Sequence, residues 1–239
     1  MDERERVIIA LDEPDFESAI GVVDSIGEAG VFFKVGVGLF AKEGGRILDA
    51  LKERGKKIFL DVKLHDIPHA VAAAGRAIAG RGVDMFTVHA SGGREMIAAC
   101  RQAVDEAAAA GAKAPAILGV TVLTSISEET LREQLLNETP IPRLVPHLAG
   151  IAKEGGADGV VASPLEAALL RERHPEPFII VTPGIRPSWA AAGDQRRTLS
   201  PGEAFRRGAT YIVVGRPVTG AADPVAALEK IISEIDSAA

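Results

Sequence analysis

Residues 57–68 read KIFLDVKLHDIP, an apolar run that passes into charged side chains. The run 57–60 is typical of a buried strand. Residues two apart on a strand share a face, so Asp61 and Lys63 are expected to point the same way, with Asp66 in the loop beyond. Charges at the end of an apolar strand are costly to desolvate unless they pair, and a chain that tolerates this cost usually uses them. A purely structural ion pair that closes the strand is the alternative interpretation.

Seven further short apolar runs resemble this one, and each of the eight is followed by a stretch with a helical pattern. Nearly continuous apolar runs are typical of parallel strands buried on both faces, and strand–helix alternation predicts a parallel sheet. Eight such units in 239 residues favour a closed (β/α)8 TIM barrel of the α/β class. No linker-like break interrupts the chain, so residues 1–239 are predicted to form a single domain. The predicted strands cover residues 7–11, 32–35, 57–62, 85–89, 117–122, 159–162, 178–182 and 211–215.

Three short patterns predict where helices begin. Residues 163–166 (SPLE) and 200–203 (SPGE) each combine an N-cap serine, a proline at the first helical position and a capping-box glutamate. Residues 223–224, an Asp-Pro pair, predict the start of the last helix in the same way.

The composition excludes several classes of function. Hydrophobic residues make up 47% of the chain, enough for a sizeable core, and the net charge of −6 argues against a nucleic-acid-binding protein or a polybasic membrane surface. The N-terminal residues show no signal-peptide pattern, and no apolar run reaches the roughly 18 residues of a membrane span, so we expect a cytoplasmic protein. The single cysteine, Cys100, excludes an intramolecular disulfide, and we expect it to be a small buried hydrophobic residue.

One loop, at about residues 183–197, follows the seventh predicted strand and is long. Loops of this size in compact domains are usually lids or binding loops. Its charged and amide side chains favour a mobile lid, and an ordinary surface excursion is the alternative.

The functional groups of a barrel gather at the C-terminal ends of its strands. The loops after strands seven and eight often bind phosphate, because glycines there expose backbone N–H groups and arginine forks onto phosphate oxygens. Gly184, Arg186, Gly215 and Arg216 supply these parts, so we predict a phosphorylated small molecule as the ligand. Surface ion pairs are the alternative for the two arginines. The other candidates at the strand ends are Asp12, Lys34, Asp61, Lys63, His89, Thr124 and Ser125.

Taken together, these motifs resemble the orotidine 5′-monophosphate decarboxylase family, and the resemblance covers essentially the whole chain. An Asp-x-Lys-x-x-Asp element alone is weak evidence for this family, because sugar-phosphate relatives in the same superfamily carry a similar element. Its extension through residues 65–68 (HDIP), with five other motifs in register, is highly specific. Those motifs are residues 10–12 (ALD), 33–36 (FKVG), 123–125 (LTS), 182–186 (TPGIR) and 213–217 (VVGRP).

The resemblance implies decarboxylation of orotidine 5′-monophosphate to UMP, the last step of de novo pyrimidine nucleotide synthesis, without a metal or cofactor. It implies that Lys63 donates the proton to C6 of the pyrimidine as carbon dioxide leaves. Lys34, Asp61 and Asp66 would complete an alternating Lys-Asp-Lys-Asp array with Lys63. A homodimer is also implied, because the residues matching Asp66 and Ile67 reach across into the partner subunit's site in that family.

The resemblance further implies which residues bind the substrate. They are Asp12 and Lys34 at the ribose, Thr124 in the substrate site, Ser125 at the pyrimidine edge, Gln195 on the lid between base and phosphate, and Arg186, Gly215 and Arg216 at the phosphate.

The charges have a physical rationale of their own. The sequence shows no lysine motif typical of pyridoxal phosphate and no obvious metal-ligand cluster, so a decarboxylase of this sequence must stabilise its carbanion largely by fixed charges. Two other functions stay open at this point. One is a metal-dependent sugar-phosphate decarboxylase or synthase of the same superfamily, and the other is a non-catalytic nucleotide-binding barrel.

Overall fold

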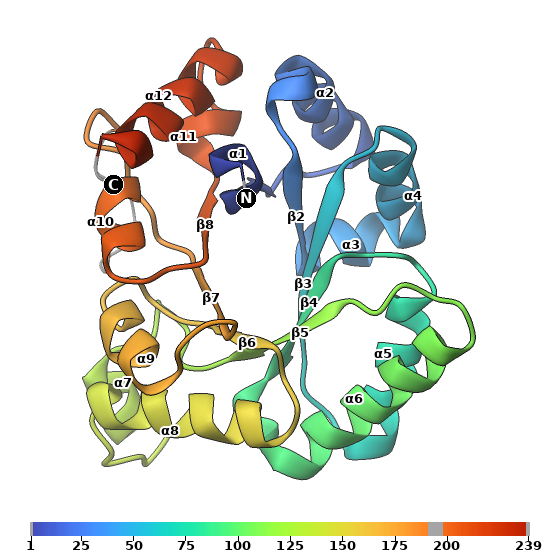
Figure 1. The fold of residues 1–239 in the computed structure, drawn as a ribbon, viewed down its shortest axis with the longest axis vertical. Coiled ribbons are helices and arrows are strands. Elements are labelled where there is room, and N and C mark those ends of the chain that lie inside the picture. The colour runs from blue at the N-terminus through green and yellow to red at the C-terminus, as the bar shows by residue number, and fades with distance from the viewer. Residues whose placement is uncertain (1, 191–197, 238–239) are drawn as a thin grey trace.

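Eight parallel strands pair in sequence order, and the last pairs with the first, so that the sheet closes into a barrel (Figure 1). The computed structural model describes residues 2–190 and 198–237. The strands are β1 Val7–Leu11, β2 Phe32–Gly36, β3 Lys57–Leu64, β4 Met85–His89, β5 Ala116–Val120, β6 Gly159–Val161, β7 Ile179–Thr182 and β8 Tyr211–Val214. Closure is made by β1 and β8, where Val7 lies opposite Ile212 and Ile9 opposite Val214. The (β/α)8 barrel predicted from the sequence is therefore confirmed.

One short helix, α1, precedes β1, and the other helices follow the strands and surround the barrel (Figure 1). They are α1 Glu3–Arg6, α2 Phe16–Ile26, α3 Val37–Glu43, α4 Gly45–Glu53, α5 Pro68–Ala79, α6 Gly93–Ala109, α7 Glu128–Glu133, α8 Ile141–Glu154, α9 Ala167–Arg173, α10 Pro201–Arg206, α11 Arg216–Thr219 and α12 Pro224–Asp236. Among the helices of residues 2–190 and 198–237, none has the length and apolarity that crossing a membrane requires.

The strands are apolar throughout because both of their faces are buried. Side chains alternate across a strand, so Ile8 packs inside the barrel while Val7 and Ile9 pack outward against the helices. Phe32 and Phe33 divide in the same way between the inner and the outer core. The inner core fills the barrel beneath the C-terminal ends of the strands, so a polar site can form only above it.

Most of the predicted element boundaries agree with the structure. Ser200 forms the capping box with Glu203, and the Asp223 side chain accepts the N–H of Ala226 at 2.9 Å, as the sequence predicts. The prediction at residues 163–166 is wrong, because α9 begins only at Ala167. The hydroxyl of Ser163 instead accepts the N–H of Leu165 at 3.3 Å in a turn that precedes the helix.

Cys100 is a buried packing residue of α6, as expected. Gly75 of α5 lies so close that a Cβ added there would be 2.8 Å from Sγ of Cys100, so two small side chains let these helices approach. Burial raises the pKa of the Cys100 thiol to about 11, and a thiol that stays protonated is a poor nucleophile.

Gly159 at the start of β6 is a position where a larger residue is predicted to weaken the barrel. A Cβ at Gly159 would overlap the backbone carbonyl of Ile179 on β7. Gly159→Ala should therefore lower the free energy of unfolding by about 1–3 kcal/mol. The matched control is Gly150→Ala in α8, where an added Cβ meets nothing within 4 Å and a gain of about 0.5–1 kcal/mol is expected. Urea unfolding measures both changes, and a Gly159→Ala protein as stable as the parent would contradict the packing argument.

Candidate active site

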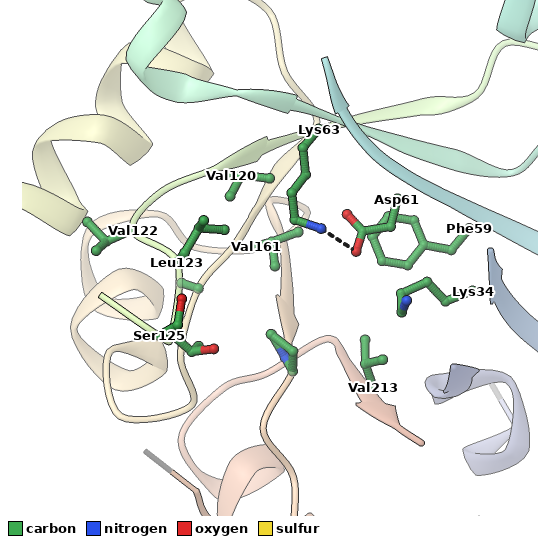
Figure 2. A pocket seen from close by; sticks show the side chains of 13 residues that line it. Lys34, Phe59, Asp61, Lys63, Val120, Val122, Leu123, Ser125, Val161 and Val213 are labelled. Atoms are coloured by element: carbon green, nitrogen blue, oxygen red, sulfur yellow. Dashed lines mark hydrogen bonds and ion pairs between the residues drawn. The ribbon is translucent and has the colours of Figure 1, made fainter. Parts of the chain in front are cut away.

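A cavity of about 200 Å³ opens at the C-terminal ends of the strands, above the inner core (Figure 2). Three charged side chains reach into it from neighbouring strands: Lys34 from β2, and Asp61 and Lys63 from β3. Thr124 and Ser125, in the turn after β5, line it as well. The structure therefore brings together five of the predicted site residues. The rest of the lining is Phe59, Val120, Val122, Leu123, Val161, Ala162, Pro183 and Val213.

Asp61 and Lys63 form an ion pair in this cavity, with Nζ of Lys63 2.7 Å from Oδ2 of Asp61. The prediction that both point the same way is confirmed. The Asp61 side chain is 13% exposed and that of Lys63 is 32% exposed, so the pair is partly shielded from water and its field is stronger than that of a fully exposed pair.

The reason that the two side chains meet differs from simple strand alternation. Leu60 pairs with Phe86 and Leu64 with Val88, so three residues of β3 lie opposite one residue of β4. This bulge places Lys63 in the left-handed region at φ 51°, which is uncommon for a residue with a Cβ. The backbone N–H of Lys63 is directed to the side chain of Thr87 on β4 at 2.9 Å.

Lys34 links the first cavity to a second one. Its Nζ lies 3.2 Å from Oδ1 of Asp12, at the end of β1, and its side chain is 12% exposed. Lys34, Pro183 and Val213 line both cavities, so the two adjoin.

The second cavity, of about 240 Å³, holds the predicted phosphate-binding residues. Arg186 follows β7 and Arg216 follows β8, and both guanidinium-bearing side chains line this cavity with Gly184 and Gly215. Two arginines at one concave surface can bind an anion through charge-assisted hydrogen bonds. Gly184 has φ 79°, a backbone conformation that glycine adopts without strain.

Asp66 and Ile67 lie outside both cavities of their own chain. Both residues are exposed, and Ile67 is 67% exposed despite its apolar side chain. Oδ1 of Asp66 accepts the N–H of Ile67 at 2.7 Å. Within one chain, the structure thus does not bring Asp66 into the cavity that holds the other three members of the predicted array.

The predicted lid at residues 183–197 falls partly outside the described residues, and Gln195 lies in the part that is not described. The described ends of this loop are joined to each other. Ile185 forms a parallel bridge with Leu199, and the N–H of Arg186 donates to the carbonyl of Leu199 at 2.9 Å. Trp189 is partly exposed, with Nζ of Lys230 5.6 Å from its ring centroid.

His89 ends β4 beside the charged pair without lining either cavity. Its ring centroid lies 5.3 Å from that of His65. Burial, followed by the nearby His65 and Lys63, lowers the pKa of His89 below its usual value of 6.5. For His89 this favours a neutral imidazole that packs against the ring of His65.

Thr87 is the polar residue that sequence reasoning missed. Its side chain contacts both Asp61 and Lys63. In the sequence, a threonine within an apolar run predicts only a strand, because threonine is a good strand former. The apolar lining residues, such as Phe59 and Val213, were not among the predicted site residues either. Within residues 2–190 and 198–237, no group of three or more His, Cys, Asp or Glu side chains is placed to hold a metal ion.

Fold and site together define a class of protein. In a (β/α)8 barrel the active site lies at the C-terminal ends of the strands, and an arginine-lined cavity after β7 and β8 stands where barrel enzymes frequently bind phosphate.

Comparison with known proteins identifies the family. The family model described as "Orotidine 5'-phosphate decarboxylase / HUMPS family" matches residues 5–231. A protein of Nostoc sp. named orotidine 5'-phosphate decarboxylase is 49% identical over 232 residues, which cover 97% of each chain. One of the same name from Moorella thermoacetica is 46% identical over 237 residues, covering 99% of this chain and 94% of the relative.

A solved structure agrees with this assignment. The crystal structure of orotidine 5'-phosphate decarboxylase from Lactobacillus acidophilus matches with a TM-score of 0.86 and 41% identity, covering 96% of this chain and 98% of that one. The chain therefore belongs to the orotidine 5'-phosphate decarboxylase / HUMPS family, as its motifs indicated.

The lowered pKa of His89 predicts a pH effect on stability. As pH falls below 6.5, the unfolded chain binds a proton at this histidine while the folded chain resists it. The free energy of unfolding therefore decreases as the pH falls from 6.5 to the lower pKa that His89 has in the folded state. The slope in this range is up to about 1.4 kcal/mol per pH unit. In His89→Gln the free energy of unfolding, measured by urea titration at pH 7, 6 and 5, should fall less steeply. His147→Gln, at an exposed site on α8, is the control, and equal slopes for His89→Gln and the parent would refute the effect.

Proposed function

We propose that this protein decarboxylates orotidine 5′-monophosphate to UMP and carbon dioxide without a metal or cofactor. The observation that carries the proposal is the partly shielded Asp61–Lys63 pair in a cavity that adjoins an arginine-lined one. Membership of the family and relatives named orotidine 5'-phosphate decarboxylase support the choice of substrate.

Lys63 is proposed to donate the proton to C6 of the pyrimidine as carbon dioxide leaves. A fixed ammonium stabilises the negative charge that develops on C6; at about 4 Å and an effective dielectric near 20, such a pair contributes about 4 kcal/mol. Asp61 would lie near the substrate's own carboxylate, and their repulsion would end when carbon dioxide departs. Lys34 lines the same cavity and would add a second positive charge beside Asp61 and the substrate's carboxylate.

The substrate would span both cavities. Arg186 and Arg216 would hold the phosphate in the second cavity, and Gly215 allows its backbone to approach. Asp12 and Lys34 would contact the ribose at the junction between the cavities, while Ser125, next to Thr124, would bind the pyrimidine edge. Phosphate binding far from C6 can then contribute energy for orienting the base.

We further propose that residues 1–239 act as one domain whose loop 183–197 closes over the ligand, with Gln195 bridging base and phosphate. The support within the described residues is the position of Arg186 in the second cavity, directly after β7. Closure on phosphate would exclude water and strengthen the electrostatic terms inside.

A homodimer is proposed to complete the charged array. Asp66 lies outside the cavity of its own chain, and the adjacent Ile67 leaves a large apolar side chain exposed. In a two-fold symmetric dimer each chain would contribute Asp66 to the other chain's site. Burial of Ile67 at the interface would stabilise that contact.

The decisive experiment follows the ultraviolet absorbance of orotidine 5′-monophosphate with purified protein in excess EDTA. We expect full conversion to UMP in the presence of the chelator. Lys63→Ala should lower kcat by at least about 100-fold, because it removes the general acid, and should bind UMP nearly as the parent does. Lys113→Ala, at a surface pair with Asp84, is the matched control and should leave kcat unchanged.

Other outcomes would identify other functions. No change in orotidine 5′-monophosphate, together with Mg²⁺-dependent turnover of a sugar phosphate, would point to a metal-dependent sugar-phosphate relative. Binding of UMP with orotidine 5′-monophosphate unchanged over hours would mean a non-catalytic nucleotide-binding barrel. Normal turnover by Lys63→Ala would remove this residue from its role.

A mixing experiment tests the shared site. Asp66→Ala and Lys63→Ala chains, each inactive alone, are combined under conditions that allow subunits to exchange. Half of the dimers formed by random exchange carry one intact site, so about a quarter of the parent activity should return.

The control mixes Lys63→Ala with Asp61→Ala chains, whose altered residues belong to the same chain's site. No mixed dimer then contains an intact site, so activity should stay absent. If the Asp66→Ala mixture also stays inactive although native mass spectrometry shows mixed dimers, Asp66 does not act across the interface.

A further inference from the structure

Thr87 is a buried residue of β4 whose hydroxyl contacts both members of the charged pair. Its Oγ1 lies 3.0 Å from Oδ1 of Asp61 and 2.9 Å from the backbone N of Lys63. The direction of each bond is fixed by chemistry, because a carboxylate only accepts and an N–H only donates. The hydroxyl therefore donates to Asp61 and accepts from Lys63 at the same time.

The bulge in β3 creates the need for this hydroxyl. Between Leu60 and Leu64 the backbone leaves the regular pairing with β4, and Lys63 adopts a positive φ. A buried N–H that leaves the sheet needs another acceptor, and the side chain of Thr87 supplies it. Thr87 thus holds the backbone of Lys63 in a conformation that a residue with a side chain rarely adopts.

The same hydroxyl orients the carboxylate. Oδ1 of Asp61 is held by Thr87 and Oδ2 by Nζ of Lys63 at 2.7 Å, so both oxygens of Asp61 have a defined partner. The two residues are linked twice, once through their own ion pair and once through Thr87. Threonine suits the position because its branched Cβ restricts χ1.

We propose that Thr87 is a positioning residue of the active site, which sets the geometry of the Asp61–Lys63 pair through one hydroxyl. Thr87 does not line either cavity, so it acts on the ligand only through its two partners. The effect on turnover rests on the proposed decarboxylase function. The effect on the geometry of Asp61 and Lys63 does not depend on that function.

The test compares Thr87→Val, Thr87→Ser and Thr121→Val. Valine keeps the shape and removes both hydrogen bonds, so kcat for orotidine 5′-monophosphate should fall about 10- to 100-fold, as for a misplaced catalytic group. KM should change by less than about threefold, because binding contacts are retained. Serine restores the hydroxyl and should recover kcat to within about fivefold of the parent.

Thr121→Val is the matched control for loss of a buried hydroxyl. Thr121 is buried after β5 and donates to the carbonyl of Val161 at 3.0 Å without contacting the charged pair. Its replacement should lower the unfolding midpoint in urea and leave kcat as in the parent. If Thr121→Val loses as much kcat as Thr87→Val, the effect is general destabilisation and the proposal is wrong.

A second measurement separates this proposal from the proposed function. Hydrogen exchange of the Lys63 amide, followed by NMR, should be faster in Thr87→Val than in the parent and close to the parent in Thr87→Ser. If the parent protein does not decarboxylate the nucleotide at all, the exchange measurement by itself tests whether Thr87 positions Lys63. Three results would each overturn the proposal. They are unchanged exchange of the Lys63 amide in Thr87→Val, unchanged kcat in Thr87→Val, and a Thr87→Ser protein that recovers no more than Thr87→Val. If Thr87→Val does not fold, Thr87→Cys replaces it, since a thiol is a weak hydrogen-bonding group.

Discussion

Closure of the barrel through β1 and β8 is the constraint on which the site depends. Because all eight strands run parallel, their C-terminal ends meet at one rim, which brings residues as distant in sequence as Asp12 and Arg216 to the same cavity. The pairing of Val7 with Ile212 joins the first and last strands and fixes this arrangement. An open sheet with the same strands would separate its two edges, and the arginines after β7 and β8 would lie far from the lysines of β2 and β3.

The apolar interior explains why charges at the rim are effective. Phe59 and Val213 line the cavity floor and also belong to the inner core, so the charged pair stands on a surface of low polarity. Charges there interact more strongly than in water, and pairing offsets the desolvation that each would suffer alone. The arginines lie in the adjoining cavity and not among these charges, so the proposed phosphate site is separate from the proposed reacting centre.

The sequence was sufficient for the barrel because each strand is a short apolar run buried on both faces. It also predicted the charged and hydroxyl-bearing side chains that line the two cavities, since strand ends converge in any barrel, but not their apolar lining. The bulge at residues 61–63 and the contacts of Thr87 could not be predicted, because they depend on the register between β3 and β4, which no local pattern records. Likewise, the wrong helix start at residues 163–166 came from a serine that bonds two residues on instead of three. The proposed role of Asp66 would depend on a second chain, and within the sequence only the family resemblance pointed to it.

For inhibitor chemistry, the wall of Lys34, Pro183 and Val213 matters because it belongs to both cavities. A flat heterocycle in one cavity and an anionic fragment in the other are separated by only these side chains, so a short covalent tether can join them. Tethering makes the second fragment's binding intramolecular and can raise the combined affinity by roughly 10²–10⁴-fold without any new contact. Lys34 is the one charged member of this wall, and its ammonium pairs with Asp12 at 3.2 Å, so it offers such compounds a polar contact between the two fragments.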